Sequence, residues 1–145
     1  TLFRSELATI MVAAFRRLGV DASVGEVTGE YCPGSHSVNA RGKTKLMGVG
    51  QRVVSGAAHV GGVVVIRGSI QVRDVLLPVY SALGIKWDPK TVGSIEDELG
   101  PIESEHVREA ILAEFASRYK LVDSLLRPGT LGLARSLEAE HLAPL

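Results

Sequence analysis

The break at Cys32-Pro33-Gly34, followed directly by strand-like segments, constrains the fold of this chain more than any other feature. Proline fixes φ and glycine permits positive φ, so the chain is expected to turn here. The segments that follow are a short alternating strand, a hairpin turn, a return strand and a further apolar strand, at residues 35–40, 41–44, 45–54 and 57–66. The sequence therefore predicts an antiparallel sheet that begins just after the only cysteine.

Helices are expected before and after these strands in the sequence. Apolar residues at helical spacing predict four helices, over residues 7–18, 70–83, 103–120 and 130–141. Ser5 can cap the start of the first helix and Gly19 its end, whereas Pro78 tends to kink or restart the second. A further short strand is expected at Ser23–Val27, and a loop or short helical turn at Trp87–Gly100. The order of helix, strands and helices indicates an α+β fold, an antiparallel or mixed sheet flanked by helices.

Composition excludes several classes of protein. Sixteen basic residues balance sixteen acidic ones, and no basic stretch is interleaved with aromatic residues, so nucleic-acid binding has no electrostatic support. The longest apolar stretch, Val60–Ile66, is too short to cross a bilayer, so no membrane role is expected. One cysteine cannot form an internal disulfide, which favours a reducing, cytoplasmic location.

The chain lacks an initiating Met and begins almost directly in a helix, so we expect it to be the C-terminal part of a longer protein. Its length, 145 residues, fits one domain. We expect residues 1–100 to form the C-terminal part of a catalytic domain. Residues 101–145 would then be a C-terminal helical extension packed on that domain.

A thiol and an amine stand out as candidate functional groups. Cys32 lies in the Pro-Gly turn and Lys45 where the hairpin returns to the sheet, and together they are the minimal parts for acyl chemistry. An ammonium close to the thiol would favour the reactive thiolate. Each residue also has a structural interpretation: Lys45 as a solvated lysine of an edge strand, Cys32 as a small buried packing residue.

The two histidines on strand candidates, His36 and His59, offer less. Neither has a His, Cys or carboxylate partner at ligand spacing, so no metal site is expected. His36, four residues after Cys32, could instead orient or deprotonate the thiol.

Two stretches carry a resemblance to a known family: Glu30-Tyr-Cys-Pro-Gly, and Gly42-Lys-Thr-Lys-Leu-Met-Gly-Val-Gly-Gln-Arg. They resemble the biotin/lipoate protein ligase superfamily, in particular lipoate-protein ligases and octanoyl- or lipoyl-transferases of actinobacterial type. Members have a strand-turn-strand reading roughly Gly-x-Lys-(Ile/Leu)-x-Gly-x-(Ala/Gly)-Gln-Arg, which Lys45 to Arg52 matches. The resemblance extends from Leu7 to about Leu99.

The resemblance implies roles for individual residues. The lysine matching Lys45 contacts the carbonyl or phosphate of an acyl-adenylate in the ligases, or the thioester carbonyl in the transferases. A fixed ammonium there stabilises the developing oxyanion. In the cysteine-dependent transferases a residue placed like Cys32 carries the acyl group as a thioester. Gly48 and Gly50 would leave room for an acyl chain over the sheet. Gln51 would bind the substrate or meet the acceptor protein; alternatively it hydrogen-bonds the sheet or is an ordinary surface residue.

The resemblance also implies a reaction: transfer of a lipoyl or octanoyl group to a lysine of a lipoyl-acceptor protein. The acceptor would be the glycine-cleavage H protein or the lipoyl domain of a 2-oxoacid dehydrogenase. A ligase would activate lipoate with ATP and Mg²⁺, leaving Cys32 a bystander, whereas a transferase would need no cofactor.

One family feature is missing from the sequence. Ligases of this superfamily carry an Arg-Arg-x-Gly-Gly-Gly loop upstream, and no such stretch occurs in this chain. We therefore expect an N-terminally incomplete domain with little independent activity. The alternative is a catalytically inactive fragment, or a non-enzymatic binding module of the same fold.

Overall fold

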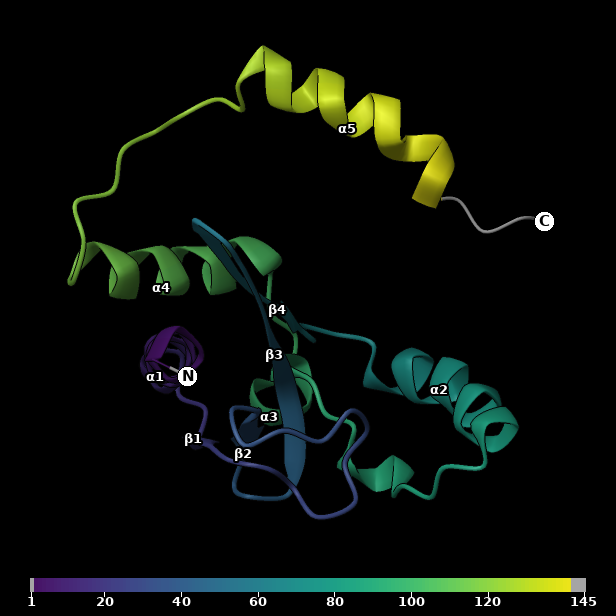
Figure 1. The fold of residues 1–145 in the computed structure, drawn as a ribbon. Coiled ribbons are helices and arrows are strands. Elements are labelled where there is room, and N and C mark those ends of the chain that lie inside the picture. The colour runs from purple at the N-terminus through teal and green to yellow at the C-terminus, as the bar shows by residue number, and fades with distance from the viewer. Residues whose placement is uncertain (1, 142–145) are drawn as a thin grey trace.

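A computed structural model of the chain describes residues 2–141. The helices are α1, α2, α3, α4 and α5, at Leu2–Arg17, Ser69–Leu83, Ile95–Leu99, Ser104–Ala116 and Pro128–His141, with a 3₁₀ turn, η1, at Pro89–Thr91. The strands are β1, β2, β3 and β4, at Ala22–Val24, Val38–Ala40, Thr44–Val54 and Ala57–Val64. Figure 1 shows these elements in chain order.

The four strands form one antiparallel sheet in the order β1-β2-β3-β4. Between β2 and β3 the register shifts: Val38 pairs with Met47, but the next residue, Asn39, pairs with Lys45. This bulge leaves Leu46 unmatched on β3. Lys45, Leu46 and Met47 are all buried, so both faces of β3 are covered at this point.

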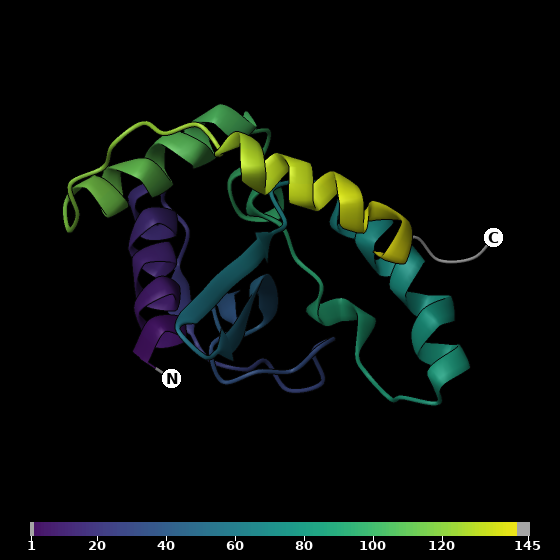
Figure 2. The same ribbon diagram turned by 45° about the horizontal axis from the view of Figure 1, so that its top comes forward.

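One hydrophobic core lies between α1 and the sheet. Its central residues include Phe15 from α1, Leu46 from β3 and Ile95 from α3, each with 0% exposure. Helix α4 packs on α1 and adds Val107 to the same core. Figures 1 and 2 show α1 and α4 together on one side of the sheet and α2 on the other.

Helix α5 differs from the other elements. An extended segment, residues 120–127, leads to it, and every α5 side chain that the structure describes is exposed. Within residues 2–141 no helix is long and apolar enough to cross a membrane.

The structure confirms the predicted α+β fold and the antiparallel sheet. Several details differ from expectation, including the first short strand, which spans Ala22–Val24 rather than Ser23–Val27. The alternating segment 35–40 contributes only Val38–Ala40, because residues 35–37 belong to the loop that carries Cys32. Helix α2 continues through Pro78 without restarting, and α4 ends at Ala116, before the expected Lys120.

Candidate active site

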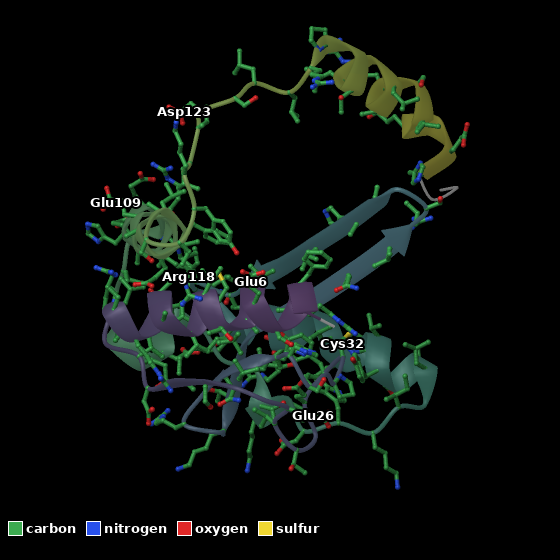
Figure 3. The ribbon with its side chains drawn as sticks, turned by 60° about the vertical axis from the view of Figure 1, so that its left-hand side comes forward. Glu6, Glu26, Cys32, Glu109, Arg118 and Asp123 are labelled. Atoms are coloured by element: carbon green, nitrogen blue, oxygen red, sulfur yellow. The ribbon has the colours of Figure 1, made fainter. Side chains whose placement is uncertain are left out.

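The loop between β1 and β2 presents Cys32 to solvent beside helix α2. Cys32 adopts a left-handed conformation, with φ of 42°, which is uncommon for a residue other than glycine. Its thiol is free and exposed. Figure 3 shows Cys32 facing α2. Tyr80 of α2 meets it there: the Cys32 amide donates to the Tyr80 hydroxyl at 2.7 Å, and Sγ lies 3.4 Å from the same oxygen.

Lys45 reaches the same loop from β3. Its side chain is buried, with 1% exposure of the residue, so the interpretation of Lys45 as a solvated edge lysine is wrong. The ammonium donates to Glu30 Oε1 at 3.0 Å and to the backbone carbonyls of Tyr31 and Cys32 at 2.9 and 2.6 Å. An ammonium has three hydrogens, so these acceptors engage all of them. The ammonium also lies 4.8 Å from the centroid of the Tyr31 ring.

Glu30 is the counter-ion that allows Lys45 to be buried. Besides Lys45, its Oε1 accepts from the Ser37 hydroxyl at 2.5 Å and from the Gly34 amide at 3.2 Å, while Oε2 accepts from the Val27 amide at 3.0 Å. A buried carboxylate needs such partners because burial removes its hydration. The Glu30–Lys45 pair therefore ties the whole loop to β3.

Three aromatic side chains close the other side of the loop. The Trp87 ring contacts those of Tyr80 and Tyr31, at centroid distances of 5.0 and 6.3 Å. Burial raises the pKa of Tyr80 above its usual value, and the hydrogen bond with the Cys32 thiol raises it further. Burial, followed by the charge of Glu30, likewise raises the pKa of Tyr31. Both phenols thus stay protonated at neutral pH.

A cavity of about 510 Å³ opens beside this cluster. Cys32, Lys45 and Gly48 line it, together with Arg4 of α1 and four further residues of the loop, Tyr31, Pro33, Gly34 and Ser37. Aliphatic side chains from the sheet and α2 form the remaining wall: Val49, Val63, Val65, Val72 and Leu76. A cavity with apolar walls and a few convergent polar groups suits an alkyl chain that ends in a reactive carbonyl.

The structure brings together three of the five predicted site residues, namely Cys32, Lys45 and Gly48. A Cβ added to Gly48 would lie 3.5 Å from Lys45 Cε, so the glycine leaves space directly beside the lysine. Gly50 and Gln51 lie further along β3, where they line a second, more open hollow. Gly48 and Val63 line both spaces, so the two are contiguous.

Two other expectations can be compared with the structure. His36 hydrogen-bonds the hydroxyls of Ser5 and Ser35, each at 3.0 Å, rather than the Cys32 thiol. Among residues 2–141, no three His, Cys, Asp or Glu side chains lie together in a way that could hold a metal ion.

Comparison with protein families places this site in a known context. The model of the lipoyl protein ligase A/B catalytic domain matches residues 2–116, which include every residue around the cavity. The chain belongs to the lipoyl protein ligase A/B catalytic domain family.

Three curated relatives with similar sequences are named as octanoyltransferases. Octanoyl-[GcvH]:protein N-octanoyltransferase of Exiguobacterium sp. strain AT1b is 31% identical over 104 residues, which is 65% of this chain and 37% of the relative. The enzyme of the same name from Geobacillus kaustophilus is 35% identical over 75 residues, 52% of this chain and 26% of the relative. The chain thus spans little more than a third of the first relatives' length.

Solved structures confirm the fold. A T. acidophilum protein assigned as a lipoate protein ligase superposes with a TM-score of 0.71 at 20% identity, over 96% of this chain and 53% of that one. Lipoate-protein ligase A bound with ATP gives the same TM-score at 19% identity, over 96% of this chain and 54% of that one.

Sequence reasoning missed two parts of the site. Glu30 stands next to Tyr31 and Cys32, and the match of this stretch to the family could have drawn attention to its carboxylate. Tyr80 lies on a helix 48 residues after Cys32, and its spacing there resembles that of an ordinary packing residue. No local pattern signals that its hydroxyl reaches the thiol.

Proposed function

We propose that this chain carries the nucleophile of a lipoyl- or octanoyl-transferring enzyme, with Cys32 as the residue that holds the acyl group. The observation that supports this most is that the exposed thiol of Cys32 and the buried Lys45 line the same cavity, which also has aliphatic walls. The name of the curated relatives describes the same chemistry, N-octanoyl transfer from octanoyl-[GcvH] to a protein.

The proposed reaction has two steps. The Cys32 thiolate attacks the carbonyl of an octanoyl-lysine amide on the donor, a C–S bond forms, the C–N bond breaks, and the leaving amine takes up a proton. The neutral amine of an acceptor lysine then attacks the thioester. The new amide forms, the C–S bond breaks, the nitrogen releases a proton and the thiolate returns, so that charges and protons balance over the cycle.

Lys45 supports both steps from its present position. Its ammonium lies at the cavity wall and holds the Cys32 carbonyl at 2.6 Å. A substrate oxyanion would replace one of the two backbone carbonyls as an acceptor, and the ammonium would then stabilise the tetrahedral intermediates. Gly48 gives the acyl chain access to this point, while Gly50 and Gln51, in the adjoining hollow, would contact the distal part of the substrate or the acceptor protein.

The ligase alternative needs ATP and Mg²⁺. Five aliphatic side chains line the cavity, and none of its described lining residues is a carboxylate that could hold Mg²⁺, which suits an acyl chain better than a metal-bound triphosphate. The apolar lining favours the thioester route, so the proposed reaction contains no adenylate step.

We propose GcvH and a second lipoyl domain, such as that of a 2-oxoacid dehydrogenase, as donor and acceptor proteins, and lipoate or octanoate as the acyl source. Residues 101–145 would serve as a helical extension of the catalytic unit, and the single free thiol fits a reducing cytoplasm.

A transfer assay with the complete gene product tests this function. Octanoyl-[GcvH] and a lipoyl domain are the substrates, without ATP, and octanoylation of the lipoyl domain is followed by mass spectrometry. We expect transfer by the native protein and none by Cys32→Ala. Full activity of Cys32→Ala with ATP and lipoate would favour the ligase, and inactivity of the native protein with both substrate sets would favour a binding module.

A further inference from the structure

The backbone of Cys32 is held at both its amide and its carbonyl by side chains from other elements. Tyr80 of α2 accepts a hydrogen bond from the amide at 2.7 Å, and Lys45 of β3 donates to the carbonyl at 2.6 Å. A left-handed conformation is unfavourable for a residue with a Cβ, and it persists only where the surroundings fix it. These two contacts therefore set the direction in which the thiol points.

The Tyr80 hydroxyl can also donate a hydrogen bond to the Cys32 sulfur, and it must be the donor when the sulfur is a thiolate. The phenolic oxygen accepts from the Cys32 amide, so the single phenolic hydrogen is free to point elsewhere. Sγ lies 3.4 Å from that oxygen, within hydrogen-bonding distance for sulfur. The phenol can thus donate to the sulfur while it accepts from the amide of the same residue.

The Tyr80 ring is itself well fixed. The residue has 8% exposure, its ring packs against Trp87 at 5.0 Å, and burial raises the pKa of the phenol so that the donor hydrogen is retained. Because the phenol is already held in place, little free energy is needed to align its hydrogen with the sulfur when the negative charge develops there.

We propose that Tyr80 is the positioning residue of the nucleophile: it holds Cys32 in its left-handed conformation and donates a hydrogen bond that stabilises the thiolate. The catalytic meaning of this inference rests on the proposed function. The other charged and titratable groups around the thiol are Lys45 from β3, Glu30 and Tyr31 from its own loop, and Arg4 from α1.

The pH dependence of Cys32 alkylation by iodoacetamide tests the proposal without any acyl substrate. Tyr80→Phe keeps the ring against Trp87 and removes only the hydroxyl. Loss of a hydrogen bond to a charged group shifts an ionisation midpoint by about one to two pH units. The midpoint of the alkylation profile of Tyr80→Phe should therefore lie higher than that of the native protein by this amount. Tyr119→Phe is the matched control, because Tyr119 contacts Glu6 on the far side of α1, and its midpoint should equal that of the native protein. Equal midpoints for Tyr80→Phe and the native protein would overturn the proposal.

A reciprocal measurement covers the case in which Tyr80→Phe does not fold. The Cys32 thiolate opposes ionisation of the Tyr80 phenol, so in Cys32→Ala the phenolate should form at lower pH than in the native protein. Absorbance at the tyrosinate band measures this ionisation. Superimposable phenolate titrations of Cys32→Ala and the native protein would contradict the proposed contact.

Activity separates this inference from the proposed function. In the complete gene product, acyl transfer by Tyr80→Phe should fall at neutral pH and recover as the pH rises, which a merely structural defect would not do. If Cys32→Ala abolishes transfer but Tyr80→Phe changes neither the alkylation midpoint nor the pH profile, the function stands and the role of Tyr80 fails. If the midpoint moves but Cys32→Ala transfers normally, Tyr80 still positions the thiol and the proposed function fails.

Discussion

Lys45 has a structural role in addition to the catalytic one proposed for it. With Glu30 it forms a buried ion pair at 3.0 Å that also secures the carbonyls of the loop carrying Cys32. Removal of one partner leaves an uncompensated charge in the interior, which costs far more than loss of a surface ion pair. A loss of activity in a Lys45 variant therefore has two possible causes, which a paired substitution can separate.

We predict that Lys45→Met lowers the free energy of unfolding by about 3–5 kcal/mol, measured by urea denaturation, because the Glu30 carboxylate stays buried without its cation. In Glu30→Gln/Lys45→Met the buried charge is gone, and the amide can keep hydrogen bonds within the loop, so most of that stability should return. Acyl transfer should stay lost in the double variant if the ammonium acts on the substrate. Recovery of transfer together with stability would show that Lys45 is structural only.

The two tyrosines of the site predict a loss of stability at high pH. Burial raises the pKa of Tyr80 and of Tyr31 above the usual value of 10.0, so the folded state resists ionisation more than the unfolded state does. The contribution of the two tyrosines to the free energy of unfolding is complete below pH 10 and declines as the pH rises toward their folded-state pKa values. Urea denaturation between about pH 9 and pH 11 should show a steeper decline for the native protein than for Tyr31→Phe/Tyr80→Phe. Parallel declines would rule out this contribution.

At the scale of elements, the segment after η1 fixes the start of β3. The Gly93 amide donates to the Lys45 carbonyl at 3.1 Å, and Val92 forms a parallel bridge with Lys45. A Cβ on Gly93 would lie 2.6 Å from Thr44 Cβ, closer than side chains tolerate. The segment therefore packs tightly against the strand that presents the lysine.

Gly93→Ala should accordingly destabilise the protein by about 1–3 kcal/mol in urea denaturation, because either β3 or the segment must shift. Gly50→Ala on β3 is the matched control, since nothing lies within 4 Å of its added Cβ. Its stability should stay within about 0.5 kcal/mol of the native protein. An equally stable Gly93→Ala would mean that this packing is not tight.

The elements also show what sequence could and could not predict. Alternation after the Pro-Gly break predicted the sheet, and helical spacing predicted α1 and α2, because both patterns are local. The burial of Lys45 depends on its ion pair with Glu30, and a strand pattern encodes neither this pair nor the bulge at Leu46. The approach of Tyr80 to Cys32 depends on where α2 lies relative to the loop, and periodicity gives no information about that.

At the scale of the whole molecule, the two C-terminal helices contribute unequally. Helix α4 packs on α1, with Val107 in the core and Glu114 paired with Arg17 at 2.8 Å, whereas every α5 side chain that the structure describes is exposed. The family match also ends at residue 116, where α4 ends. The contact with α1 makes α4 a part of the folded core.

We therefore predict that a chain ending at Lys120 keeps the thermal midpoint of the full chain within a few degrees. A chain ending at Gly100 should lose its cooperative transition, because the α1 surface that meets α4 becomes exposed. Differential scanning calorimetry of the two truncated chains measures this. A cooperative transition in the shorter chain would place the edge of the core at residue 100.

The central claim, that Cys32 carries the acyl group, is tested most directly by intact-protein mass spectrometry. The complete gene product is incubated with octanoyl-[GcvH] alone, so that no acceptor can discharge the intermediate. We predict a mass increase of one octanoyl group that hydroxylamine removes and that Cys32→Ala does not show. An adduct of the same mass on Cys32→Ala, or transfer to a lipoyl domain by that variant at the native rate, would contradict the account.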